Sequence, residues 1–508
     1  MRNIKIFDTT LRDWAQTAGV NMIPEKKIAI ANKLDDFWID MIEAWFAISS
    51  IWDFEAIKTI SESVSARVFS LARLNNLDID SSFEALYNSK NRWIHTFIWT
   101  SPMHRDFKLK MSKQDIINQI WEKVLYARSK FNNDLDLIMF SPEDALRTEE
   151  EFLLETIDCA IKAGANIINI PDTVWFSQPN EIWELFKKLV NTFPNTDFSV
   201  HTHNDLWNAV SNSLSAISNW ANIIQWTFPP AFWERAWNAD LIQVLMNIIK
   251  RPDIYWFNIN NKIDMKKSTD LVQFISNSIW KRISDNYPII WWDVFKHSSW
   301  IHQDWTNKNK STYEIISPEE IWYKIEQSFI LTNQSWRSWL KNAVSVYFWV
   351  ELEGELLNSV FDKFKDLASN NIWMVVTMDN IREILNSSWV DLNRNIIFKD
   401  YFIYLDPNWA KASIVLNINW VKNTILSNWV WPVDAIYNAI LEATGKYDDI
   451  NLIDFSISSL SSSPSSEAKV SIKIESQWKI YEEFWIDKDI VKASIIAFVN
   501  CLDRIKFK

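Results

Sequence analysis

The sequence predicts an α/β protein with an N-terminal (β/α)8 barrel, a helical linker and a C-terminal α+β domain. In the first half of the chain, short apolar runs alternate with segments that have apolar residues at helical spacing. Repeated strand-then-helix units predict a parallel sheet, and eight of them in about 250 residues is the usual size of a closed barrel. After this region the pattern first becomes irregular and then returns to alternating strands, which indicates further domains.

The eight predicted barrel strands are short apolar runs. They span residues 4–7, 41–44, 67–71, 94–98, 135–140, 167–170, 198–201 and 223–226. The helices predicted between them include residues 24–37, 113–131, 149–163, 178–192 and 238–250. An open, doubly wound sheet is the alternative architecture, and the count of eight units favours the closed barrel.

Three domains are predicted from these changes of pattern: the barrel at 1–254, a linker region at 255–369 and a last domain at 370–508. In the last domain, the predicted strands are 412–418, 468–474 and 479–484, and the predicted helices are 433–443 and 488–502. The serine-rich run 456–466 is interpreted as a flexible connection inside this domain.

Charge and cysteine usage exclude several classes of protein. The 64 acidic and 52 basic residues give a net charge of -12, so no basic surface for nucleic acid is expected. We expect no secretion signal and no membrane segment, because no cationic start leads into an apolar run and no 18-residue apolar stretch occurs. Cys159 and Cys501 have neither ligand nor redox spacing, which fits a reducing cytoplasm.

The usage of glycine and tryptophan is anomalous, with 4 Gly and 32 Trp. Average usage predicts roughly 36 glycines in a chain of this length, and the two observed counts together give 36. Trp38, Trp220 and Trp409 follow turn or helix-end signals that need a residue tolerant of positive φ. Our hypothesis is that most tryptophans stand at glycine positions, encoded by UGA codons that the source organism reads as Gly. The alternative is a genuinely Trp-rich protein.

Residues able to do chemistry fall at the predicted carboxyl ends of the strands, where a (β/α)8 barrel places its active site. They are Arg12 and Asp13 after strand one, His95 on strand four, Glu143 after strand five, Thr173 after strand six, and His201 and His203 closing strand seven. Residues two apart on a strand point to the same side, so His201 and His203 can converge on one ion. With an oxygen ligand from Asp13, they suit Mn²⁺, Mg²⁺ or Zn²⁺.

Each of these candidates also has a purely structural interpretation. An isolated His-x-His pair is more often a strand surface or a satisfied pair than a metal site. Glu143 could be a helix N-terminal carboxylate, and Arg12 could be an ion-pair partner. The distribution of the six histidines favours a functional site. Those in predicted loops or at strand ends are His95, His201, His203, His297 and His302, and only His104 has no role.

Seven motifs resemble those of the 2-isopropylmalate synthases, within the alpha-isopropylmalate synthase/homocitrate synthase family. They are FDTTLRDW at 7–14, IHTFIWTS at 94–101, FSPEDALRT at 140–148, NIPDTVWF at 169–176, HTHNDLW at 201–207, WERAWNADL at 233–241 and SSWIHQDW at 298–305. In these motifs the family has Gly at most of the Trp positions; Trp99, where a small residue is expected, is an exception. The resemblance therefore supports the codon hypothesis independently.

The resemblance implies a metal-dependent condensation of acetyl-CoA with 2-oxoisovalerate, the first committed step of leucine biosynthesis. The implied ligands of the divalent metal, Mn²⁺ or Mg²⁺ with Zn²⁺ as an alternative, are Asp13, His201, His203 and Asn238. The implied 2-oxoacid pocket comprises Arg12, His95, Ser141, Asn169 and Thr173. The implied catalytic residues are Arg12, Glu143, His302 and Tyr323. His302 and Tyr323 lie in the linker region, so they must reach the barrel from there, in the same or a neighbouring subunit.

The resemblance also extends to the linker and the last domain. Residues 331–340 resemble a turn near the acyl-CoA side, and the last domain resembles a leucine-binding regulatory domain, which implies a homodimer with leucine as an allosteric inhibitor. Ala47 departs from the family, which usually has Pro there. The alternatives are citramalate or homocitrate synthase, a hydroxymethylglutaryl-CoA-type lyase, and, if the tryptophans are literal, a non-catalytic amino-acid-binding protein.

Overall fold

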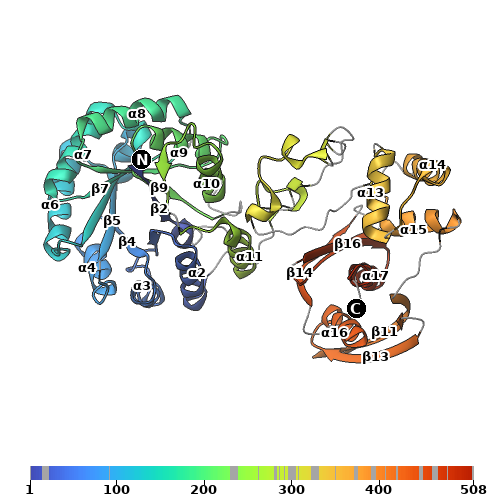
Figure 1. Ribbon diagram of the computed structural model, residues 1–508. Coiled ribbons are helices and arrows are strands. Elements are labelled where there is room, and N and C mark those ends of the chain that lie inside the picture. The colour runs from blue at the N-terminus through green and yellow to red at the C-terminus, as the bar shows by residue number, and fades with distance from the viewer. Residues whose placement is uncertain are drawn as a thin grey trace. The chain divides into compact units, whose positions relative to one another are not determined.

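The computed structural model divides the chain into two compact units, Met1–Val294 and Phe295–Lys508, which are described separately (Figure 1). It describes residues 2–13, 22–90, 92–174, 176–228, 238–260, 262–279, 283–284, 286–290, 292–295, 302, 305–306, 308–321, 331–333, 335–348, 350–370, 376–388, 390, 396–406, 408–418, 421–445, 450–459, 467–477 and 479–505. The predicted boundaries at 254 and 369 stay a prediction.

The first unit is a closed barrel of eight parallel strands, as the sequence predicts. The strands are β2 (Lys5–Asp8), β3 (Met41–Glu43), β4 (Arg67–Arg73), β5 (Trp93–Trp99), β6 (Leu137–Glu143), β7 (Ile167–Pro171), β8 (Asp197–His201) and β9 (Ile223–Trp226). β2 pairs with both β3 and β9, which closes the barrel and excludes the open sheet. All eight predicted strands are confirmed.

Helices surround the barrel strands (Figure 1). The main ones are α2 (Pro24–Asp36), α3 (Ile51–Ser63), α4 (Asn76–Ala85), α6 (Lys113–Lys130), α7 (Glu150–Ala163), α8 (Pro179–Thr192), α9 (Ala209–Ser218) and α10 (Leu241–Lys250). Local sequence explains their starts: Ser112 and Asp115 form a capping box at α6, and Pro179 occupies the first position of α8.

Shorter elements complete the first unit. They are β1 (Arg2–Asn3), α1 (Thr10–Asp13), α5 (Pro102–His104), the π-helix η2 (Arg105–Leu109), η3 (Ala145–Arg147), β10 (Phe257–Asn258), η4 (Met265–Lys267) and α11 (Ser268–Ser278), with η5 (Trp292–Phe295) at the division between the units. β1 and β10 pair in parallel as a separate two-stranded sheet.

The interior of the barrel has an apolar layer beneath a polar one. The apolar layer is a buried cluster of Phe7, Met41, Phe69, Trp93, Met139, Ile167 and Ile223. Two residues further along their strands come Glu43, His95, Ser141 and Asn169. Because side chains two apart on a strand share a face, these polar groups also point into the barrel, one layer nearer its carboxyl ends. The alternation of side chains along the strands thus places a polar layer directly above an apolar one.

The first half of the second unit contains short 3₁₀ turns and a helical core. The turns are η6 (Lys310–Thr312) and η7 (Pro318–Ile321), and the helices are α13 (Arg337–Phe348), α14 (Gly354–Asn370) and α15 (Met378–Ser387). Apolar residues of the three helices, including Leu340, Phe364 and Leu385, form one buried cluster. α13 and most of α14 thus lie in the linker region predicted at 255–369, whereas α15 lies beyond its predicted end.

The rest of the second unit repeats one arrangement, three antiparallel strands followed by a helix. The first set is β11 (Ile396–Asp406), β12 (Trp409–Ile418), β13 (Val421–Trp429) and α16 (Pro432–Thr444). The second set is β14 (Ile450–Ser459), β15 (Ala468–Ser476), β16 (Lys479–Asp487) and α17 (Ile490–Asp503). α16 packs on β12 and β13, and α17 packs on β15 and β16.

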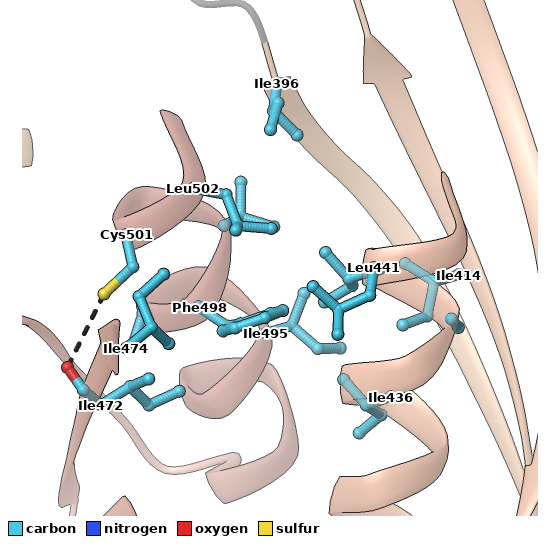
Figure 2. Close-up of a cluster of buried hydrophobic side chains, with 14 of the residues drawn as sticks. Ile396, Ile414, Ile436, Leu441, Ile472, Ile474, Ile495, Phe498, Cys501 and Leu502 are labelled. Atoms are coloured by element: carbon cyan, nitrogen blue, oxygen red, sulfur yellow. Dashed lines mark hydrogen bonds between the residues drawn. The ribbon is translucent and has the colours of Figure 1, made fainter. Parts of the chain in front are cut away.

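The core of this α+β domain is almost entirely aliphatic. Figure 2 shows Phe498 and Leu502 of α17 in one buried cluster with Ile436 and Leu441 of α16 and the strand residues Ile414, Ile472 and Ile474. Cys501 is a free buried thiol that hydrogen-bonds to the Ile472 carbonyl oxygen at 3.6 Å. Cys159, in α7, is also free and buried.

Two expectations for the last domain are wrong. Residues 456–459 of the serine-rich run belong to β14, where they pair with β15, and do not form a flexible connection; residues 460–466 lie outside the described residues. Trp409 begins β12 without a positive φ. The positive φ expected at Trp38 and Trp220 is confirmed. In the part of the chain that the structure describes, no helix has both the length and the apolar character needed to cross a membrane.

Candidate active site

A cavity of about 620 Å³ opens at the carboxyl ends of the barrel strands. Its polar lining comprises Arg12, Ser49, Arg73, His95, Lys108, Ser141, Glu143, Asn169, Thr173, His201 and His203. Its apolar lining comprises Phe46, Ile48, Leu71, Phe97, Trp99 and Pro171. All the polar candidates predicted at the strand ends except Asp13 thus line one cavity, together with an apolar wall that the sequence did not reveal.

A chain of hydrogen bonds crosses the cavity floor from the first strand to the sixth. Arg12 Nε donates to Glu43 Oε2 at 2.8 Å, and the other oxygen of Glu43 contacts His95 Nδ1. His95 Nε2 lies 2.7 Å from Ser141 Oγ, to which Asn169 Nδ2 donates at 2.8 Å. Burial opposes the ionisation of Glu43, but the charges and hydrogen bonds of His95 and Arg12 outweigh burial and hold its pKa at about 2.

Glu43 was missed by the sequence analysis, although a signal was present. It is the one charged residue in the apolar run that forms β3, and it is fully buried. A carboxylate in such a position requires partners, because an unpaired buried charge is costly.

The two histidines at the end of β8 converge, as predicted. The His201 and His203 rings lie 4.7 Å apart at 89°, and both line the cavity. His203 Nδ1 donates to the Asp172 carbonyl oxygen at 3.0 Å, because a carbonyl oxygen can only accept. Asn238 forms an isolated bridge with His203, and its amide nitrogen lies 3.2 Å from His201 Nε2.

Burial, followed by the charge of Arg12, lowers the pKa of His201 well below 6.5, so its imidazole is neutral. Asp13 is not among the lining residues: its carboxylate pairs with Arg12 Nη1 at 2.5 Å and accepts a hydrogen bond from Thr9. No three His, Cys, Asp or Glu side chains of the described residues are arranged as a metal site. The donor types present, neutral imidazole, amide oxygen and carboxylate, nevertheless suit a hard or borderline divalent cation.

Glu143 ends β6 and faces the same cavity. Thr173 Oγ donates to its Oε1 at 3.0 Å. Burial raises the pKa of Glu143 above its ordinary value, although Thr173, Arg12 and His95 act in the opposite direction. A carboxyl group with a raised pKa, placed beside a polar cavity, can exchange a proton with a bound molecule.

The remaining candidates are His104, His297, His302 and Tyr323. His302 belongs to the second unit, where its ring stacks on Tyr313 with centroids 4.0 Å apart. Tyr323 and His297 lie outside the described residues. His104, for which no role is expected, hydrogen-bonds to Ser101 Oγ at 3.0 Å. The roles of His302 and Tyr323 therefore stay predictions.

A closed (β/α)8 barrel with converging histidines and buried carboxylates at its carboxyl ends defines a barrel enzyme, and the HMGL-like family model matches residues 3–275. A homocitrate synthase post-HMGL domain-like model matches residues 289–372, and a LeuA allosteric (dimerisation) domain model matches residues 375–506. These three matches follow one another along the chain and include most of both compact units.

Relatives extend this match over the whole chain. The 2-isopropylmalate synthase of Halothermothrix orenii is 36% identical over 99% of this chain and 97% of its own length. The enzymes of the same name from Brevibacillus brevis and Ruminiclostridium cellulolyticum are each 34% identical, over 99% of this chain and 97% of theirs. The chain belongs to the 2-isopropylmalate synthase family. The acyltransferase class and the regulatory domain expected from the sequence motifs agree with this membership.

Proposed function

We propose that this chain condenses acetyl-CoA with 2-oxoisovalerate (3-methyl-2-oxobutanoate) to give 2-isopropylmalate and CoA. The observation that carries this proposal is the composition of the cavity, in which hydrogen-bonding groups on the floor face an apolar wall of Phe46, Leu71 and Phe97. A 2-oxoacid with a branched apolar tail has the matching chemistry. The relatives named 2-isopropylmalate synthase support the same assignment.

In this reaction the floor residues bind and orient the 2-oxoacid. Arg12, Ser141 and Asn169 offer donors for its carboxylate and keto oxygens, and His95 holds Ser141 in place. Thr173 orients Glu143, which lines the same cavity. The groups proposed to hold a divalent metal, Mn²⁺ or Mg²⁺ with Zn²⁺ as an alternative, are Asp13, His201, His203 and Asn238. When bound, the metal would polarise the keto group as a Lewis acid.

Carbon–carbon bond formation requires a base and an acid. A base removes a proton from the methyl group of acetyl-CoA, and the resulting carbanion attacks the keto carbon, whose oxygen takes up a proton and becomes a hydroxyl. Water then cleaves the thioester to release CoA and leave the second carboxylate. Glu143, His302 and Tyr323 are the proposed acid and base groups. The raised pKa of Glu143 supports its place among them, because a group that titrates nearer neutral pH exchanges protons more readily.

The second unit is proposed to regulate this activity. The match to a LeuA allosteric (dimerisation) domain supports a dimer and a regulatory ligand. We take that ligand to be leucine, acting as a feedback inhibitor, and the protein to be a cytoplasmic homodimer. The linker region is proposed to contribute His302 and Tyr323 to the acyl-CoA side of the site.

One assay tests these proposals together. CoA release is measured with 2-oxoisovalerate, pyruvate and 2-oxoglutarate on metal-stripped protein, before and after Mn²⁺, Mg²⁺ or Zn²⁺ is added, and with increasing leucine. We expect release only with added metal, fastest with 2-oxoisovalerate, and inhibited by leucine. Preference for pyruvate or 2-oxoglutarate would instead indicate citramalate or homocitrate synthase. If leucine leaves the rate of CoA release unchanged, only the regulatory proposal is contradicted.

A further inference from the structure

Glu43 uses both of its carboxylate oxygens to hold groups that line the cavity, although Glu43 itself does not line it. We propose that Glu43 is the positioning residue of this site. By holding Arg12 through Nε and His95 through Nδ1, it leaves Arg12 Nη2 and His95 Nε2 to face other groups of the cavity: His201 at 3.4 Å and Ser141 at 2.7 Å, respectively. Its action is thus exerted through other residues, and it rests on the proposed function.

The hydrogen-bond capacities of the chain show what this arrangement does. An ionised carboxylate can only accept, so His95 Nδ1 must carry a proton. A serine hydroxyl has one proton and two lone pairs, and Ser141 already accepts from Asn169 Nδ2. Ser141 is thus held between His95 and Asn169, and one hydrogen-bonding position of its hydroxyl is left for the bound 2-oxoacid.

Glu43 acts on Ser141 through the His95 ring. Glu43 holds the ring at Nδ1, so Nε2 stays 2.7 Å from Ser141 Oγ, to which Asn169 Nδ2 also donates. Glu43 therefore positions the Ser141 hydroxyl for the 2-oxoacid and has no direct effect on acetyl-CoA.

The first test is Glu43→Gln, which retains the shape and removes the charge. Loss of a residue that orients metal ligands lowers metal affinity or activity by about 10- to 100-fold. We expect a loss of the same order in kcat/KM for 2-oxoisovalerate, while KM for acetyl-CoA stays unchanged. Asp136→Asn is the matched control, because Asp136 is 1% exposed, pairs with Arg92 at 2.7 Å and lies outside the cavity lining.

If Glu43→Gln loses stability as Asp136→Asn does, but keeps the wild-type kcat/KM for 2-oxoisovalerate, the inference is wrong. A wild-type protein that releases no CoA with any 2-oxoacid would instead contradict the proposed function, so the two failures are distinguishable.

A double-mutant cycle covers the case in which Glu43→Gln does not fold. Glu43→Asp keeps the charge with a shorter reach, and Ser141→Ala removes the hydroxyl that Glu43 is proposed to orient. Because the two residues would act through one chain of hydrogen bonds, the double variant should lose little more kcat/KM than the more impaired single variant. Fully additive losses would show that Glu43 does not act through Ser141 and would overturn the proposal.

Discussion

Three helices of the barrel, α7, α2 and α9, end in the same backbone geometry. The left-handed residue that follows the helix is glycine after α7 but tryptophan after α2 and α9. At the end of α7 the Ala165 N–H donates to the Ala160 carbonyl at 2.9 Å, across Gly164 with φ +113°. This closure requires a left-handed residue after the helix, and glycine adopts it without steric cost. In α2 and α9 the corresponding residues are Trp38 and Trp220, with φ of 65° and 74°.

The hydrogen bonds show that these are the same turn. Ile39 N–H donates to the Leu34 carbonyl at 3.3 Å at the end of α2, and Ala221 N–H donates to the Ala216 carbonyl at 3.1 Å at the end of α9. Each bond spans five residues, as in α7. The backbone of α2 and α9 is therefore that of a glycine-terminated helix, although the sequence has the bulkiest residue there.

This contrast extends beyond helix ends. Eight non-glycine residues of the described chain have positive φ, and half of them are tryptophans: Trp38, Trp45, Trp207 and Trp220. Trp226 and Trp485 also bury an indole N–H for which the described residues provide no acceptor, at a cost of about 1–3 kcal/mol each. The hypothesis that tryptophan stands at glycine positions explains the four strained residues, and the following predictions test it.

The largest effect is expected from changing the four positive-φ tryptophans to glycine together. A left-handed residue with a Cβ costs about 1–2 kcal/mol, so four of them amount to about 4–8 kcal/mol. Natural domains have only about 5–15 kcal/mol of stability in total. The variant with all four substitutions should therefore unfold at a much higher urea concentration than the Trp-containing chain, as measured by circular dichroism. Equal midpoints, or equal turnover by the two proteins, would contradict the codon hypothesis.

The fold was more predictable from sequence than the site, for a physical reason. Barrel strands are buried on both faces, so they are short apolar runs that can be recognised locally. β11, β13 and β14 were missed because one face of each is exposed, and charged or polar residues such as Lys399, Asp400 and Lys422 interrupt the apolar pattern.

The residues of the candidate site also differ in how well the sequence predicts them. His201 and His203 could be found because they are close in sequence and share a strand face. Glu43 could not be placed, because its partners Arg12 and His95 lie 31 and 52 residues away in sequence and are brought to it by the barrel. Similarly, the apolar wall requires loops and strands that only the fold brings together.

A second, smaller effect is expected from changing two glycines to alanine. The comparison separates the cost of a left-handed backbone from the cost of steric crowding by a Cβ. A Cβ at Gly164 would lie 3.1 Å from Cγ of Arg128, whereas a Cβ at Gly445 would meet nothing within 4 Å. Gly164→Ala should thus destabilise the barrel by roughly 2–3 kcal/mol, from strain and overpacking together. Gly445→Ala, with φ +65°, should lose only the strain, about 1 kcal/mol. If both variants lose the same free energy of unfolding in urea, the left-handed backbone alone accounts for the destabilisation.

The smallest effect is expected from Trp220→Gly alone, and its sign is decisive. Trp220 is 62% exposed, so its indole buries little surface, and its main recorded contact is with the Arg2 guanidinium, 5.0 Å from the ring centre. Relief of the left-handed strain should therefore stabilise the protein by about 1 kcal/mol. Trp121→Gly is the control, because Trp121 is 47% exposed inside α6, where glycine lacks helix propensity and should destabilise by about 1 kcal/mol. If both variants lower the urea midpoint, the left-handed backbone at Trp220 does not destabilise the protein. The similar ends of α9 and α7 would then have no effect on stability.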